Sequence, residues 1–332
     1  MNHIRNLTLG LALGASMGSA HAFINITYDY RFDTTGFFTD ERKATLEQAA
    51  QAFESRIFDD LTAIVSTPGG NGINANAFNT QISNLSVAAG ELVIFVGATP
   101  HVSSEGRNTS VPVAGQMAGF NGLTSTSDQT INSPYMVNAR ERGQTGWPDS
   151  DVSTWGGQIQ FDSTKSWYAD TDASTVESFA GQYDLYSATL KGLLSVFGAD
   201  QNNDGWANKL SGQGAFNGAK AKAEYNVVNS RGILQAIPTD DDAGNLRMRP
   251  GIQGKLADGT LQTLVFSSGL AMGERRYMTE LDYAMLDDMG WDVSGFTEMP
   301  VTPPVPEPQA WLLLAAGLGL IAHRARARST LS

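Results

Sequence analysis

Two apolar segments, one at each end of the chain, restrict the part that can fold as a globular unit to about residues 23–299 of 332. Residues 1–22 combine a basic start at Arg5, a short apolar run interrupted by glycine, and an Ala-His-Ala sequence that ends at Ala22. This pattern is typical of a secretory signal peptide, whereas the run is too short for a membrane span. We therefore expect signal peptidase as a partner and a mature chain that begins near Phe23.

The C-terminal end has three consecutive parts. Residues 300–308 form a proline-rich linker, and residues 309–332 contain a thirteen-residue apolar run followed by three arginines. A helix of that length is about 20 Å long, short of the roughly 30 Å hydrocarbon core of a bilayer. The residues that define the pattern are Pro306, Glu307, Pro308, Arg324, Arg326 and Arg328.

This C-terminal order closely resembles the PEP-CTERM sorting signal of Gram-negative bacteria. The resemblance implies export, transient anchoring of the C-terminal segment in the inner membrane, and processing near the Pro-Glu-Pro sequence by an exosortase-type membrane enzyme. It further implies delivery to the cell surface or extracellular matrix. The resemblance covers only the end of the chain and is silent on the activity of the rest.

The segment between the two ends is acidic and contains few metal-binding side chains. Without residues 1–22 and 300–332 the chain has 18 basic and 33 acidic residues, a net charge near −15, no cysteine and one histidine, His101. Nucleic acid is not an expected partner, because phosphate backbones require clustered Lys and Arg. The absence of cysteine excludes disulfides and thiolate zinc sites, and a single imidazole excludes a zinc site built from several histidines.

The first half of this segment alternates strand and helix patterns. Phe23–Phe32, Leu92–Val96 and Gln158–Asp162 have the composition of strands, with the second apolar on both faces. Asp40 can cap a helix in which apolar residues recur at helical spacing. Those apolar residues are Leu46, Ala49, Ala50, Phe53, Ile57 and Leu61. Two stretches rich in small polar residues predict loops, residues 68–76 and 104–127. The order predicts an α+β fold with a mixed sheet.

Residues 184–198 carry the strongest helix signal. Asp184 is a good N-cap, and Gly198 suits the left-handed position after a helix end. The broad apolar face consists of Tyr186, Leu190, Leu193, Leu194 and Phe197. The opposite stripe is polar, with Ser187, Lys191 and Ser195 four residues apart, and a lysine in such a stripe is ordinarily solvated.

This helix resembles the active-site helix of zincin metallopeptidases, whose signature is H-E-x-x-H-x-x-G-x-x-H. In that motif two histidines share a helix face, a Glu activates the zinc-bound water, and a Gly turn brings in the third ligand. When Gly198 is aligned with the motif glycine, Lys191 and Ser195 occupy the first two histidine positions. Gly192 then occupies the Glu position and Gln201 the third histidine position. The resemblance implies a zincin-like, metzincin-like scaffold without its zinc ligands and catalytic Glu.

Three further segments resemble those around this helix in exported zincin-like proteins that carry the same sorting signal: Ile26–Arg42, Gly214–Ala219 and Met278–Trp291. The resemblance implies a mixed sheet with long helices over residues 23–198 and a smaller, loop-rich lobe over residues 199–299. Met272 could occupy the position of a methionine turn, with a core methionine as the alternative.

Residues 200–205 fit the first half of a calcium loop, with side-chain oxygens at Asp200, Asn202 and Asp204 before Gly205. The twelfth position is Ser211 instead of the usual Glu, and an ordinary turn is the alternative. A carboxylate-only metal site is also conceivable, drawn from Asp184, Asp200, Asp204 and Asp282. A structural calcium ion is therefore the one cofactor that we consider, and zinc is not expected.

These observations support three functional hypotheses. The first is an exported surface or matrix protein on a catalytically inactive zincin-like scaffold that serves binding or structure. The second is an active exported hydrolase, a peptidase or glycosidase, with a non-His centre such as Lys191 paired with Ser187 or Ser195. The third is an adhesin of a polysaccharide matrix, with exopolysaccharide or a matrix protein as partner. Exposed tryptophans could stack on sugars, with burial in the core as the alternative, and the candidates are Trp147, Trp155, Trp167 and Trp206.

Overall fold

The computed structural model describes most of the chain between residues 23 and 294. The described ranges are 23–66, 72–100, 113–117, 123–125, 133–175, 177–199, 204–212, 214–229, 236–242 and 245–294. The expected signal peptide and all of the expected sorting-signal residues lie outside these ranges. Within them, no helix has the length and apolar character needed to cross a bilayer.

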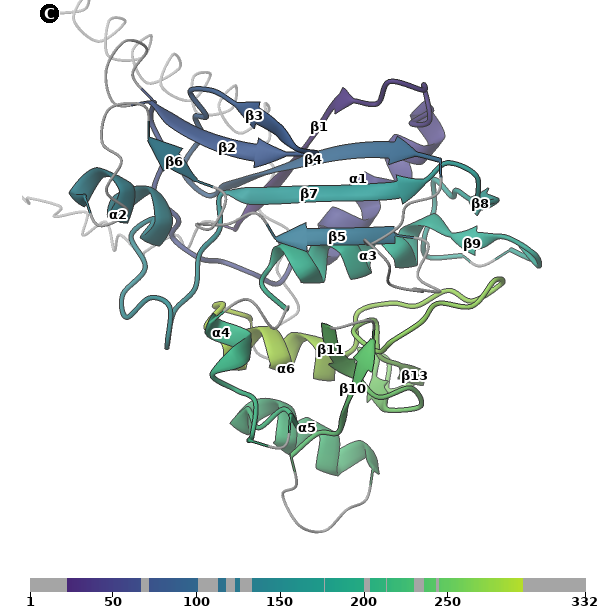
Figure 1. The fold of residues 1–332 in the computed structure, drawn as a ribbon. Coiled ribbons are helices and arrows are strands. Elements are labelled where there is room, and N and C mark those ends of the chain that lie inside the picture. The colour runs from purple at the N-terminus through teal and green to yellow at the C-terminus, as the bar shows by residue number, and fades with distance from the viewer. Residues whose placement is uncertain are drawn as a thin grey trace, which may run out of the picture.

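The chain alternates strands and helices in its first half and is mostly helical with short hairpins in its second (Figure 1). The helices are α1 (Asp40–Glu54), α2 (Pro134–Glu141), α3 (Leu185–Val196), α4 (Asp204–Ala207), α5 (Ala219–Asn229) and α6 (Glu280–Met289). The strands are β1 (Asn25–Phe32), β2 (Ile73–Ala77), β3 (Thr80–Ile82), β4 (Glu91–Thr99), β5 (Val113–Met117), β6 (Thr124–Ser125), β7 (Gly156–Asp162), β8 (Trp167–Tyr168), β9 (Tyr183–Asp184), β10 (Thr239–Asp242), β11 (Asn245–Met248), β12 (Gln253–Lys255) and β13 (Leu261–Thr263).

A four-stranded sheet in the order β1-β4-β7-β5 organises the first half (Figure 1). β1, β4 and β7 are parallel to one another, and β5 runs antiparallel to β7 at the edge. β4 lies in the interior with most of its side chains buried, as its uninterrupted apolar run predicts. The mixed α+β class and the three strands predicted from local pattern are therefore confirmed.

Both stretches that were predicted to be loops contain strands, so those predictions are wrong in part. β2 lies at the end of the first stretch, because Ile73 and Ala75 pack into a buried cluster. β5 and β6 lie in the second stretch. β5 forms by pairing with β7, where Gly115 lies opposite Ile159, and such a long-range pairing leaves no local hydrophobic signal in the sequence.

α1 and α3 pack side by side on one face of the sheet (Figure 1). Phe53 of α1 stacks on Phe197 at the end of α3, with ring centroids 4.7 Å apart. The predicted start of α1 was displaced by one residue, because the side chain of Thr39 is the cap that accepts the N–H of Arg42. α1 also ends earlier than predicted, since Ile57 follows it as an isolated bridge residue and is nevertheless fully buried.

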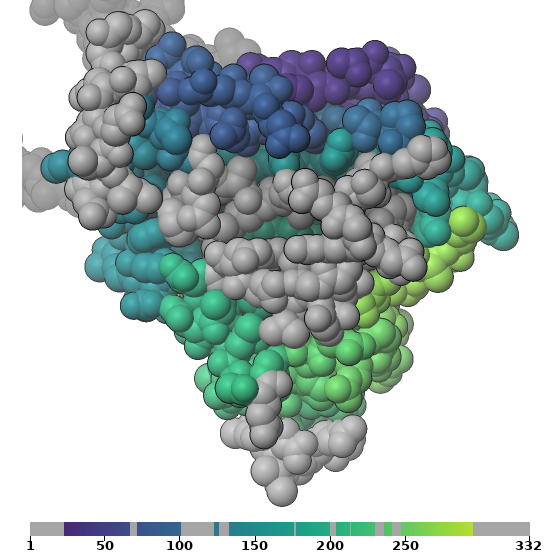
Figure 2. Space-filling view, viewed as in Figure 1, coloured from purple at the N-terminus to yellow at the C-terminus, as the bar shows by residue number. Residues whose placement is uncertain are grey.

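One cluster of buried apolar side chains extends from the sheet through α3 into the second half of the chain. Its members beyond α3 include Trp206, Phe216, Phe266, Leu281 and Trp291. The expected lobe boundary at residue 198 lies directly after α3, and the cluster continues across it. A separate cluster around Phe95 and Trp155 lies on the opposite face of the sheet. In the space-filling view, the second half forms a narrower part below the sheet region (Figure 2).

Candidate functional site

The helix that carries the zincin-like pattern forms where the sequence predicts it, but it is buried on all sides. The Asp184 side chain caps α3 by accepting the N–H of Ser187 at 3.0 Å, and Gly198 has a φ of +93°. Every residue of α3 is buried, including the expected polar stripe. The expectation of a solvated stripe is therefore wrong, since Lys191 is 6% exposed and Ser195 is 1% exposed.

Lys191, at the first histidine position, binds a loop from the second half of the chain. Its Nζ donates to the carbonyl oxygen of Val265 at 3.2 Å and to that of Ser267. This loop is held by Asp282, whose carboxylate accepts the N–H groups of Val265 and Phe266 at 3.3 and 3.1 Å. An ammonium group that donates to two carbonyls therefore lies where the motif requires an electron-pair donor.

Gly192, at the Glu position, is a point of close contact between α3 and the sheet. A Cβ atom at this position would lie 2.9 Å from both Cδ1 and Cγ2 of Ile159 in β7. Carbon atoms in van der Waals contact prefer separations of about 3.5–4.0 Å. The space that a catalytic Glu would need is therefore filled by Ile159.

Ser195, at the second histidine position, is hydrogen-bonded to a second cationic side chain, Arg247. Its hydroxyl donates to the carbonyl oxygen of Lys191 at 3.3 Å and accepts from Nη2 of Arg247 at 3.0 Å. Arg247 also donates to the carbonyl oxygen of Ala199 at 3.4 Å, and its guanidinium lies 5.0 Å from the centre of the Phe266 ring. Zinc needs neutral imidazole, thiolate or carboxylate ligands, so two cations and a hydroxyl at these positions do not fit it.

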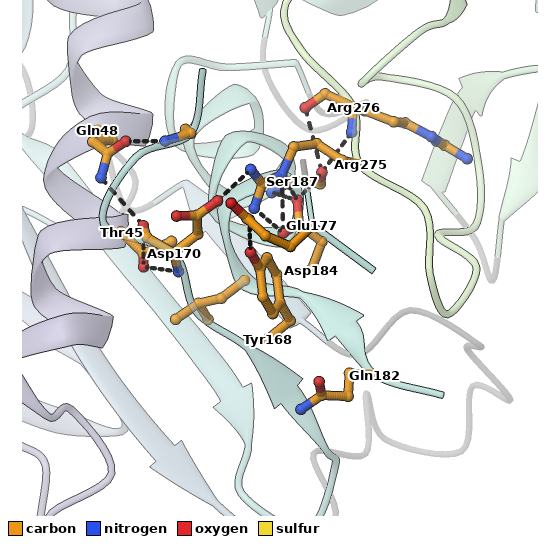
Figure 3. A network of polar contacts seen from close by, with 12 residues as sticks. Thr45, Gln48, Tyr168, Asp170, Glu177, Gln182, Asp184, Ser187, Arg275 and Arg276 are labelled. Atoms are coloured by element: carbon orange, nitrogen blue, oxygen red, sulfur yellow. Dashed lines mark hydrogen bonds and ion pairs between the residues drawn. The ribbon is translucent and has the colours of Figure 1, made fainter. Parts of the chain in front are cut away.

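A buried ion network fixes the N-terminus of α3 (Figure 3). Arg275 lies 2.8 Å from Asp184 and 2.8 Å from Asp170, and all three side chains are less than a tenth exposed. The peptide N–H of Arg276 donates to the Ser187 hydroxyl at 2.6 Å, and Thr45 of α1 exchanges hydrogen bonds with the Asp170 backbone. Burial opposes the charge of Asp170, but hydrogen bonds from the Asp172 backbone and Arg275 lower the pKa of its carboxyl.

The sequence indicated only one part of this network, the capping role of Asp184. Arg275 lies 91 residues from its Asp184 partner, and no local pattern links the two. Burial opposes the charge of Arg275 as well, yet hydrogen bonds to the two carboxylates raise the pKa of its guanidinium. The network therefore joins three separate segments of chain through charges that compensate one another.

Of the proposed calcium loop, residues 200–205, the structure describes only the last two residues. Asp200 and Asn202 lie outside the described residues, as does Gln201, the third motif position. Asp204 is exposed and begins α4, while Gly205 is buried within that helix. The calcium loop stays a prediction.

Two of the four carboxylates considered for an oxygen-only site have structural partners. Asp184 is paired with Arg275, and Asp282 forms a capping box with Thr279 at the start of α6. Burial raises the pKa of Asp282. Among the residues that the structure describes, no group of three or more His, Cys, Asp or Glu side chains is placed to hold a metal ion.

The remaining candidates divide between core and surface. Three tryptophans are buried as the core interpretation predicts, and they are Trp155, Trp167 and Trp206. Trp147 is partly exposed, with the Arg140 guanidinium 5.4 Å from its ring centre. Met272 is 52% exposed, so its interpretation as a core methionine is wrong.

Comparison with known proteins finds no family model that matches the chain, no similar curated protein and no similar solved structure. The functional argument therefore depends on the residues of α3 and their partners. In the described residues, Lys191 donates to backbone carbonyls, Ser195 accepts from an arginine, and Gly192 packs against an isoleucine. All of these contacts are structural.

Proposed function

We propose that this chain is an exported surface or extracellular-matrix protein built on a zincin-like scaffold that binds or supports other molecules and does not hydrolyse peptide bonds. The observation that carries the proposal is the placement of the Lys191 ammonium and the Arg247 guanidinium beside Ser195 on α3. Export and sorting are supported by the sequence patterns of the two ends.

The contacts of these two cations favour a structural role for the former motif positions. Lys191 connects α3 to the loop that contains Val265 and Ser267, and Arg247 connects β11 to Ser195 and Ala199. Both cations thus join α3 to the second half of the chain. A buried helix that packs on a mixed sheet, with a lysine at the first histidine position and an arginine hydrogen-bonded to the serine at the second, is consistent with a scaffold whose stability depends on these contacts.

The rival hypothesis of a Ser-Lys nucleophile is disfavoured by the directions of the hydroxyl hydrogen bonds. A catalytic serine must deliver its proton to a base. The Ser187 hydroxyl donates to the Asp184 carboxylate at 2.5 Å, and the Ser195 hydroxyl donates to the backbone oxygen of Lys191. Neither arrangement is one in which the Lys191 amine takes the serine proton.

An activity screen combined with ligand restoration tests the proposal. We expect the purified protein to hydrolyse neither casein nor a panel of chromogenic glycosides. Hydrolysis of casein by the wild-type protein that is lost in Lys191→Ala, and retained in the matched control Lys220→Ala, would contradict the proposal. Lys220 is suitable because its side chain is 58% exposed and lies on α5.

The restoration variant asks whether the scaffold is zincin-like. It combines Lys191→His, Gly192→Glu, Ser195→His and Gln201→His with Ile159→Ala, because Ile159 fills the space at position 192. We expect this variant, once circular dichroism shows that it is folded, to bind one equivalent of zinc. A folded variant that takes up no zinc would contradict the zincin-like assignment.

A further inference from the structure

A surface pocket of about 400 Å³ lies apart from the motif positions of α3. It is bordered by the first turn of α1, which follows β1, and by β8, which follows β7. β1 and β7 are both parallel to β4, so the pocket lies at the carboxyl edge of the parallel strands. Ligands of open α/β sheets bind at that edge, and the volume is within the range of small-molecule sites.

Three polar side chains of the pocket have donor or acceptor atoms that can still form hydrogen bonds with a ligand. Glu41 is exposed, and its carboxylate has no hydrogen-bond or ion-pair partner in the described part of the chain. Arg42 is held in place, with its Nη1 donating to the Phe37 carbonyl at 2.8 Å and its guanidinium 4.1 Å from the Phe37 ring centre. This geometry commits only one of its nitrogens. The amide nitrogen of Gln182 donates to the Trp167 carbonyl at 3.2 Å, which leaves its amide oxygen as an acceptor.

The charges of the pocket favour a neutral ligand. Glu41 and Arg42 are adjacent and opposite in sign, so the pocket has little net charge, while the folded segment as a whole is near −15. That field disfavours an anionic ligand, and the guanidinium disfavours a cationic one. A ligand with several hydroxyl groups meets both requirements, because each hydroxyl can donate to a carboxylate or amide oxygen and accept from a guanidinium.

We propose that this pocket binds a neutral hexopyranoside unit of a carbohydrate, with Glu41 and Gln182 accepting hydrogen bonds from its hydroxyls and Arg42 donating to them. The inference goes beyond the proposed function and is independent of α3. It gives the binding protein a ligand class and a site. In Figure 3, Gln182 lies apart from the ion network around Asp184 and Arg275, while Tyr168 borders both the pocket and the network.

The aromatic residues of the pocket predict weak binding. Trp167 is only 5% exposed, and the Tyr168 ring stacks on Phe179 with centroids 4.5 Å apart. The Arg275 guanidinium also lies 5.4 Å from the Tyr168 ring centre. The sugar therefore contacts ring edges instead of an open aromatic face, and hydrogen bonds to exposed groups supply most of the affinity. A Kd of about 1 mM is the scale expected for a monosaccharide held in this way.

Titration of the full protein with three methyl glycosides, followed by ligand-observed NMR, tests the proposal. The probes are the methyl glycosides of glucose, mannose and galactose, with glucuronate as the anionic comparison. We expect at least one glycoside to bind in the millimolar range and glucuronate to bind more weakly. Glu41→Gln and Gln182→Ala should each weaken binding at least about fivefold, and Arg42→Met about tenfold, because hydrogen bonds to charged groups are the stronger ones.

Glu41→Gln keeps the test decisive even if Arg42→Met disturbs the start of α1, since Glu41 is exposed and glutamine has nearly the same size and shape. The matched control is Arg31→Met, which removes a 55% exposed arginine of β1 that does not line the pocket. It should bind like the wild-type protein. Tighter binding of glucuronate, no binding of any of the three glycosides, or unchanged binding in both Glu41→Gln and Gln182→Ala would overturn the proposal.

Discussion

Asp59 is expected to make the stability of the fold depend on pH. Its side chain is 1% exposed, and its two carboxylate oxygens share the N–H of Asp292 at 3.3 and 3.2 Å. Burial is the main cause of the shift in its pKa, the hydrogen bond from the Asp292 N–H opposes it, and the charges of Asp292, Asp151 and Asp60 add to it. Together they raise the pKa of Asp59 to about 8.

The direction of the effect follows from proton uptake. In the unfolded chain an aspartate has a pKa of about 4, so between about pH 4 and about pH 8 the folded state holds a proton that the unfolded state has released. The stabilisation that the protonated Asp59 gives to the folded state is complete below about pH 4, the unfolded pKa. It is lost as the pH rises through about 8, the folded pKa. The free energy of unfolding should fall by about 1.4 kcal/mol per pH unit in this window, or at most about 6 kcal/mol in total.

Urea unfolding of the wild-type protein and of Asp59→Asn between about pH 5 and about pH 8 measures this effect. The asparagine keeps the shape of the protonated carboxyl and cannot ionise, so the variant should gain stability relative to the wild type by about 1.4 kcal/mol for each pH unit. Asp40→Asn, a change at an exposed aspartate that is not among the groups that shift the pKa of Asp59, should follow the wild-type pH dependence. A stability difference between wild type and Asp59→Asn that is the same at every pH would refute this reasoning.

Three further substitutions test the contacts of α3. Gly192→Ala should destabilise the protein by about 1–2 kcal/mol in thermal unfolding, since overpacking against Ile159 exceeds the helical preference for alanine, and an increase in stability would show that the contact is loose. Arg275→Met should cost about 3–5 kcal/mol because it leaves the buried carboxylate of Asp184 without its charge partner, and a loss below 1 kcal/mol, about the value of an exposed pair, would contradict that account. Lys191→Met should cost about 1–3 kcal/mol because two carbonyls lose their donor, and unfolding in urea that is unchanged would indicate that the ammonium is not needed there.

Much of the first half of the fold could be predicted from local pattern. β4 is a short apolar run, and α3 combines an aspartate cap with a glycine at its end. Caps and periodicity act over a few residues, so a sequence reveals them directly. The cap at Asp184 and the left-handed conformation of Gly198 are therefore confirmed, while the alignment with the zincin motif stays a prediction.

The rest depends on contacts between segments that are far apart in the sequence. β5 lacks an apolar run and exists as a strand through its pairing with β7. The burial of Lys191 requires carbonyls that lie 74 and 76 residues away. Neither the pairing nor the carbonyls can be inferred from hydrophobic periodicity, which reports only which face of an element is apolar. For the same reason, the pairing of Arg275 with Asp170 and Asp184 could not be predicted from the sequence.

The zinc content of the purified protein tests the central claim most directly. The protein would be treated with a chelator, supplied again with zinc, freed of unbound metal and measured for zinc per chain. Because Lys191 and Arg247 place positive charges at the expected ligand positions, we predict far less than one equivalent. One tightly bound equivalent that disappears in Lys191→Ala or Gln201→Ala, together with cleavage of protein substrates, would contradict the account.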